Sequence, residues 1–216
     1  MAERLYLFDT TLRDGQQTSG VDFSLADKIR IANALDNLGL DYIEGGYPGA
    51  NPTDSQFFAE DRKLASAVMT AFGMTKRAGR SADNDPGFME VLNAQAGAVC
   101  LVAKSWDYHV DVALGISNDE NLASIRDSVA AVGKHGREAM IDCEHFFDGY
   151  KANRDYALAC ATAAFEAGAR WVVLCDTNGG TLPDEVFEIV SDVAQHIPGD
   201  HLGIHTHNDT ENAVAN

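Results

Sequence analysis

The sequence predicts an α/β fold built from repeated strand–helix units. Three observations indicate it: short apolar runs rich in β-forming residues recur along the chain, capped helical segments separate them, and polar residues gather where the runs end. Such alternation is typical of right-handed parallel βαβ units. The 216 residues, 45% of them hydrophobic, suffice for one sizeable core, so one domain is expected over residues 1–216.

Seven strands are expected. They begin near Leu5, Asp41, Val68, Ala98, Glu138, Trp171 and His201. A closed barrel and an open doubly wound sheet both fit this order, but an open sheet normally carries a glycine-rich nucleotide loop after its first strand. Residues 13–17 read RDGQQ instead. Polar residues at the strand ends favour a barrel with its active site at the carboxyl-terminal face.

Capping residues mark the helices between these strands. Ser24 and Asp27 read as a capping box that opens a helix ending at Gly39. Its expected apolar stripe consists of Leu25, Ile29, Ala32, Leu35 and Leu38. Further helix starts are expected at Asn51, which precedes a proline, and at Ser117, Asn153 and Thr181.

The number of expected strands does not match that of a complete barrel. A complete barrel needs eight strands and typically about 250 residues. This sequence stops a few residues after the seventh expected strand. We therefore interpret it as a (β/α)8 TIM barrel present only through about the seventh strand, with residues 1–216 forming one C-terminally incomplete domain. Its first and seventh strands would be open edges.

The composition limits the classes of molecule that the protein is expected to bind. The 33 acidic and 16 basic residues give a net charge of −17, which would repel a polyanion such as DNA. No apolar stretch is long enough for a membrane span and no signal segment opens the chain, so a cytoplasmic protein is expected. Scattered Cys100, Cys143, Cys160 and Cys175 are expected to be buried, reduced thiols.

A His-x-His motif follows the last expected strand. Side chains alternate faces along a strand, so His205 and His207 point the same way and are spaced to bind one metal ion. Taken alone, the motif fits two polar residues at a strand end better than it fits a metal site. The remote pair Arg13 and Asp14, which follows the first apolar strand, distinguishes the two interpretations.

Two segments together resemble a known family: FDTTLRDG at residues 8–15 and HTHND at residues 205–209. They are similar to the metal-dependent Claisen-type TIM barrels, which include isopropylmalate, homocitrate and citramalate synthases and HMG-CoA lyases. The resemblance runs along the whole chain. The segments at residues 42–49, 104–107, 144–150 and 175–181 most resemble the citramalate synthase branch.

The resemblance implies a catalytic domain with a divalent metal ion bound by Asp14, His205 and His207. Two imidazoles and a carboxylate suit zinc or manganese, while a chelating oxoacid and waters would also admit magnesium. The family's additional asparagine ligand and its C-terminal CoA-binding segments would lie beyond this sequence, so residues 1–216 alone are expected to be inactive and poorly stable.

The resemblance also implies roles for four other residues. Arg13 would polarise the substrate ketone and stabilise the developing alkoxide, and Glu44 would hold Arg13 by a charge-assisted hydrogen bond. Glu144 and Thr177 would line the oxoacid pocket. Glu144 is also a candidate base for the acetyl-CoA methyl proton, a role that residues beyond Asn216 could fill instead.

The expected reaction is condensation of acetyl-CoA with pyruvate to give citramalate and CoA, a step toward isoleucine. Alternatives are the same chemistry on 2-oxoisovalerate, as in 2-isopropylmalate synthase, an HMG-CoA lyase-like cleavage, and a non-catalytic fragment. By the resemblance the complete protein would be a homodimer acting on small molecules. The net charge and the lack of a long apolar stretch lead us to expect no nucleic-acid or membrane partner. Lys104 is expected to be a solvated cation, with contact to CoA phosphates as the alternative, and His109 is expected to face solvent.

Overall fold

The computed structural model describes residues 4–216, within which all seven predicted strands are present. β1 begins at Phe8, later than expected, after an exposed segment at residues 4–7. The other strands begin at or next to the predicted residues. The strands are β1 (Phe8–Asp9), β2 (Tyr42–Gly46), β3 (Val68–Met74), β4 (Ala98–Lys104), β5 (Glu138–Glu144), β6 (Trp171–Asp176) and β7 (Leu202–Thr206).

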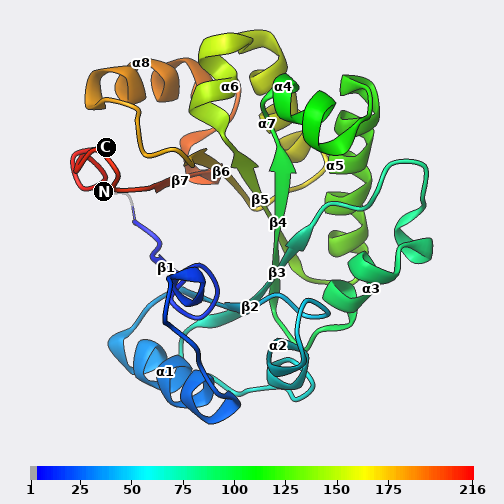
Figure 1. Ribbon diagram of the computed structural model, residues 1–216, viewed down its shortest axis with the longest axis vertical. Coiled ribbons are helices and arrows are strands. Elements are labelled where there is room, and N and C mark those ends of the chain that lie inside the picture. Colours follow the sequence, from blue (N-terminus) through cyan, green and yellow to red (C-terminus); the bar gives the residue numbers. More distant parts are fainter. Residues whose placement is uncertain (1–3) are drawn as a thin grey trace. The chain divides into compact units, whose positions relative to one another are not determined.

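Helices separate the strands (Figure 1). They are α1 (Leu25–Leu38), α2 (Pro52–Phe57), α3 (Pro86–Asn93), α4 (Asp107–His109), α5 (Asn118–Lys134), α6 (Phe146–Ala152), α7 (Arg154–Glu166) and α8 (Pro183–Val193). The short helices α4 and α6 have no side-chain cap that marks their start, and the sequence does not predict them or α3. The described chain divides into two compact units, residues 4–73 with 86–100 and residues 74–85 with 101–216.

Most of the predicted helix caps are confirmed. Ser24 and Ser117 each form a capping box, and Asn51 and Asn153 each accept a hydrogen bond from a backbone N–H in the first turn. The expectation for Thr181 is wrong. Its hydroxyl donates to Asp176 Oδ1 over 2.9 Å and its N–H to Asp176 Oδ2 over 3.1 Å, and the helix begins only at Pro183.

In the first unit, β1 pairs with β2 and β2 with β3, both in parallel. Helices α1 and α2 pack against β2, whose residues are all buried. Gly46 at the end of β2 has a φ of 141°, and a Cβ there would lie 2.5 Å from the Asp54 carboxyl carbon. Both the backbone conformation and the close approach of Asp54 therefore require glycine at this position.

Helix α1 differs from the predicted apolar stripe. Its buried residues are Lys28, Ala32 and Asp36, whereas Leu38 is 76% exposed. Asp36 is buried because it accepts hydrogen bonds from the backbone N–H groups of residues 65–67, which lower its carboxyl pKa to about 2. Polar anchoring to neighbouring backbone, rather than apolar spacing alone, thus decides which face of α1 is covered.

In the second unit, β5 pairs with β6 and β6 with β7, again in parallel. Helices α5, α6 and α7 pack against β5 and β6 and lie outside them in Figure 1.

All four cysteines of the chain are buried thiols, as predicted. Burial raises the pKa of the Cys143 thiol well above its ordinary value and that of Cys160 to about 12, so both are held as inert thiols.

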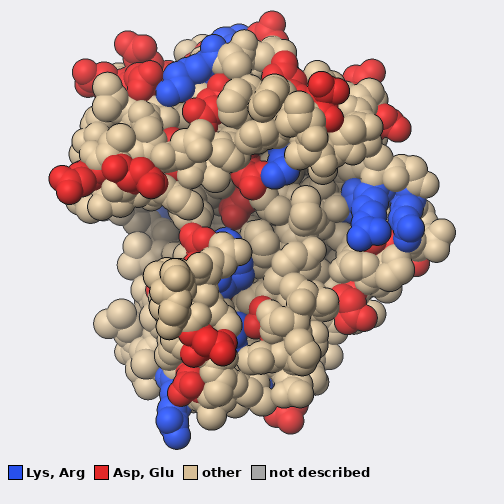
Figure 2. Space-filling view, in the orientation of Figure 1, with Lys and Arg blue, Asp and Glu red and all other residues tan. Residues whose placement is uncertain are grey.

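The acidic composition is visible on the surface. Figure 2 shows Asp and Glu side chains spread over much of the viewed face, with Lys and Arg in a few separate places. This distribution agrees with the net charge of −17. Among the helices of residues 4–216, none combines the length and apolar character needed to cross a membrane.

Candidate active site

The first unit holds Arg13 in a fixed position. Arg13 lies in the turn after β1, where the carbonyl of Thr10 accepts hydrogen bonds from the backbone N–H groups of Arg13 and Gly15. The Arg13 Nε donates to Glu44 Oε2 over 2.6 Å, and its guanidinium carbon lies 4.0 Å from the centre of the Phe72 ring. Glu44 is fully buried, so this guanidinium is held by a desolvated carboxylate and an aromatic face.

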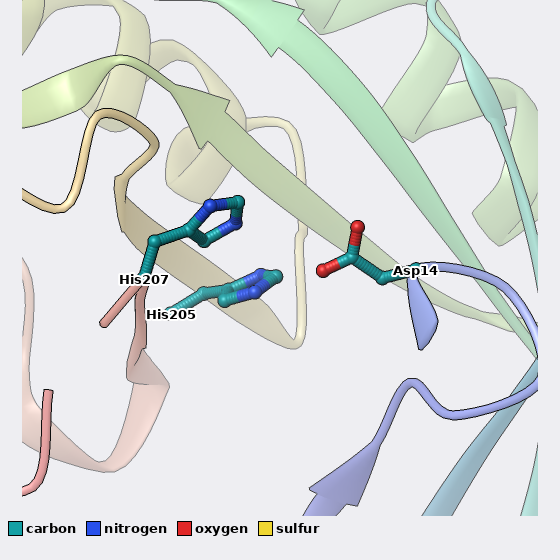
Figure 3. A group of neighbouring side chains, drawn as sticks. All are labelled: Asp14, His205 and His207. Carbon is teal, nitrogen blue, oxygen red and sulfur yellow. The ribbon is translucent and has the colours of Figure 1, made fainter. Parts of the chain in front are cut away.

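Asp14 follows directly in the same turn. Its side chain is 26% exposed, and its Oδ1 lies 3.4 Å from an Arg13 terminal nitrogen. Figure 3 shows the Asp14 carboxylate projecting from the loop after β1. In the first unit, therefore, the structure brings together three of the predicted site residues, Arg13, Asp14 and Glu44.

Sequence reasoning missed Lys28, which lies beneath this turn. Its side chain is fully buried, and its Nζ donates to the Leu12 carbonyl over 2.9 Å, to the Gly45 carbonyl over 3.0 Å and to Asp54. Leu12 precedes Arg13 and Gly45 follows Glu44. One ammonium group therefore joins the backbone on both sides of the Arg13–Glu44 ion pair.

The second unit carries the two predicted metal-binding histidines. His205 lies in β7 and His207 just after it, and their ring centres are 5.1 Å apart. Figure 3 shows both imidazoles extending from this one strand end. The backbone N–H of His207 donates to the Asp176 carbonyl over 3.2 Å, which fixes the chain where it leaves the strand. The two histidine side chains thus extend from the same strand end, as the alternation of side chains along a strand predicts.

A second group of polar atoms surrounds His205. Ligand atoms of Asp142, Cys175 and His205 all lie within 4.8 Å of one another, and Asp142 and Cys175 are buried. Cys175 is the direct neighbour of His205 in the β6–β7 register. The sequence signal that could have identified Asp142 is a carboxylate inside an otherwise buried strand.

Glu144 and Thr177 lie at neighbouring strand ends in the second unit. Glu144 is the last residue of β5, and its side chain forms an ion pair with Lys104 at the end of β4. The next residue, His145, donates its backbone N–H to the Thr177 hydroxyl over 2.9 Å. The expectation of a solvated Lys104 is wrong, because its side chain is only 18% exposed and pairs with a predicted site residue.

The expectation of a solvent-facing His109 is also wrong. Its ring lies 4.5 Å from that of His145 and 4.7 Å from that of Trp106, and its Nδ1 is buried without a hydrogen-bond partner in the described chain. Burial, with the nearby charges of His145 and Lys104, lowers the pKa of His109 and favours its neutral form. A polar aromatic group thus lies beside Glu144.

Comparison with known proteins identifies the class. Residues 4–216 match the HMGL-like family. The chain superposes on the HMG-CoA lyase of Bacillus subtilis with a TM-score of 0.81 at 20% identity, covering 100% of this chain and 72% of that one. This likeness confirms the predicted (β/α) barrel class. The chain therefore belongs to the HMGL-like family.

Within this family, the chain is similar to synthases of two kinds, at different levels of identity. The chain is 50% identical to the (R)-citramalate synthase of Aquifex aeolicus over 218 residues, which cover 100% of this chain and 41% of that protein. It is 32% identical to the 2-isopropylmalate synthase of Pelotomaculum thermopropionicum over 220 residues, covering 100% of this chain and 42% of that protein. The chain spans about two fifths of the length of these relatives.

Proposed function

We propose that the protein carrying this chain condenses acetyl-CoA with pyruvate to give citramalate and free CoA, in the biosynthesis of isoleucine. The observation that carries the proposal is the 50% identity with a citramalate synthase, against 32% with a 2-isopropylmalate synthase. The similarity to the citramalate synthase extends over 100% of this chain. We also propose that the protein acts as a homodimer on these small-molecule substrates in the cytoplasm.

Asp14, His205 and His207 would hold a divalent metal ion, which we propose to be magnesium, manganese or zinc. The donor set fits such an ion: two half-buried imidazoles share one strand end, and Asp14 offers an accessible carboxylate. The buried Asp142 and Cys175 beside His205 would restrict its ring orientation. When bound, the ion supplies Lewis-acid polarisation of the oxoacid.

Replacing a proposed ligand is expected to weaken metal binding. His205→Ala and His207→Ala each remove one of three donors, so the affinity of the intact protein for Mn²⁺ should fall about tenfold or more. Calorimetric titration in the absence of substrates measures it directly. His196→Ala, at an exposed position, is the matched control and should bind Mn²⁺ as wild type does. Equal affinities in all four proteins would contradict the assignment of the two histidines.

The remaining residues would divide the chemistry among them. Glu144 would take a proton from the acetyl methyl group, and the electron pair left on that carbon forms the bond to the keto carbon of pyruvate. Arg13, fixed by Glu44, would stabilise the negative charge that develops on the keto oxygen, which is then protonated to a hydroxyl. Attack of water on the thioester releases CoA. Thr177 would line the oxoacid pocket.

The intact protein is expected to prefer pyruvate over 2-oxoisovalerate. Rings of Trp106, His109 and His145 pack together beside Glu144, and Phe146 and Phe147, which follow His145 in the chain, are fully buried. The two extra methyl groups of 2-oxoisovalerate would then meet bulky side chains. Pockets of the wrong size discriminate by about 1–3 kcal/mol per methylene-sized change.

The measurement is CoA release with each oxoacid, compared as kcat/KM. A preference of at least tenfold for pyruvate supports the proposal. Higher kcat/KM with 2-oxoisovalerate would contradict the assignment to citramalate formation and favour the isopropylmalate reaction, while leaving the metal site and the role of Arg13 unaffected.

A further inference from the structure

The ion pair between Lys104 and Glu144 lies at two adjacent strand ends and is largely shielded. The Lys104 and Glu144 side chains are 18% and 25% exposed. Ion pairs on an open surface contribute little and hold no fixed geometry. Here both partners project from the last residues of strands, and one of them, Glu144, is the proposed base.

The backbone around this pair is fixed on both sides. The buried amide of Asn121 donates to the Lys104 carbonyl over 2.8 Å. The hydroxyl of buried Ser105 donates to the Glu144 carbonyl over 2.7 Å, and the Ser105 N–H donates to the same oxygen over 3.3 Å. Gly149 packs against this segment so closely that a Cβ would lie 2.5 Å from the Ser105 carbonyl oxygen. The ammonium and the carboxylate are therefore presented to each other by a rigid frame.

The contact uses only one carboxylate oxygen. Lys104 contacts Glu144 Oε2, whereas Oε1 accepts no hydrogen bond from the residues that the structure describes. Burial lowers the pKa of the neighbouring His109, which disfavours a competing positive charge beside this pair. A carboxylate with one oxygen fixed and the other available is the arrangement that a directed proton acceptor needs.

We propose that Lys104 is a positioning residue for the condensation: it fixes Oε2 of Glu144 so that Oε1 is directed at the acetyl methyl proton. This inference rests on the proposed function and gives Lys104 a role other than the solvated cation or the CoA-phosphate contact that the sequence suggested. Lys104 acts through Glu144, so its removal should lower turnover without weakening the binding of either substrate.

A double-mutant cycle in the intact protein tests this inference. Lys104→Met should lower kcat about 10- to 100-fold, the scale of a small misplacement of a reacting group, with KM for pyruvate and acetyl-CoA changed less than about threefold. In a Glu144→Gln background the same substitution should change kcat less than about twofold, because the group it positions is gone. Lys104→Arg, which retains a cationic donor, should recover most of the rate.

Lys151→Met is the matched control, since Lys151 pairs with Glu185 at 3.5 Å in the same unit and both are about two fifths exposed. It should leave kcat unchanged. With an active wild type, three results each overturn the inference alone: unchanged kcat in Lys104→Met, a raised KM at constant kcat, or an equal loss in the Glu144→Gln background. A wild type that releases no CoA with pyruvate overturns the proposed function and this inference with it.

Discussion

Arg13→Lys is expected to lower kcat of the intact protein by about 10²–10³ while leaving the fold and Mn²⁺ affinity unchanged. The guanidinium donates through Nε to Glu44 and stacks on Phe72, so its two terminal nitrogens remain in a fixed plane. A lysine ammonium is a point charge that cannot contact Glu44 and the developing alkoxide in the same geometry. Removing one fixed donor to a developing oxyanion typically costs this much.

The measurement is kcat with pyruvate and acetyl-CoA at saturating concentrations, alongside calorimetric titration with Mn²⁺. Arg30→Lys, on the exposed face of α1, is the matched control and should have wild-type values of both. A near-normal kcat in Arg13→Lys would remove Arg13 from the proposed chemistry.

Lys28→Met is expected to destabilise the protein by about 3–5 kcal/mol, the usual cost of removing one partner of a buried ion pair. The substitution leaves Asp54 buried without its cation, and the carbonyls of Leu12 and Gly45 lose their shared donor. Asp54 retains hydrogen bonds from Tyr47 N at 2.9 Å and Asn51 Nδ2 at 3.0 Å, which do not replace a full charge.

Urea unfolding of wild type and variant gives the difference in the free energy of unfolding. Lys63→Met is the control, because Lys63 is 86% exposed and should change stability by no more than about 0.5 kcal/mol. Adding Asp54→Asn to Lys28→Met should restore part of the loss, since the unpaired charge is then removed. A loss below about 1 kcal/mol in Lys28→Met would show that the ammonium does not support this turn.

The strands and most helices were predictable because their signals are local. β4 and β6 are short apolar runs with clear boundaries, and the caps at Ser24, Ser117 and Asn153 depend only on groups three residues further along the chain. Which residues of α1 are buried was not predictable from such local signals. Apolar spacing assigns a lysine to solvent, whereas the burial of Lys28 depends on an aspartate 26 residues away and on two carbonyls that only the folded chain brings near.

The same distinction applies to the site. Arg13, Asp14, His205 and His207 were predicted because two compact motifs place them at strand ends. The partner of Glu144 was missed, because Lys104 is 40 residues away and its contact depends on how β4 and β5 end. Lys104 has no signal of its own, since a lysine after an apolar strand usually faces solvent.

The most direct test of the central claim is to identify the product that the intact protein forms from acetyl-CoA and pyruvate. Mass spectrometry and a thiol assay follow product and CoA in the presence of Mg²⁺, Mn²⁺ or Zn²⁺ and after chelation of the metal. We expect citramalate and CoA in equal amounts with at least one of these ions, and neither after chelation. CoA release without citramalate, or equal citramalate formation with and without the metal, would contradict the proposed function.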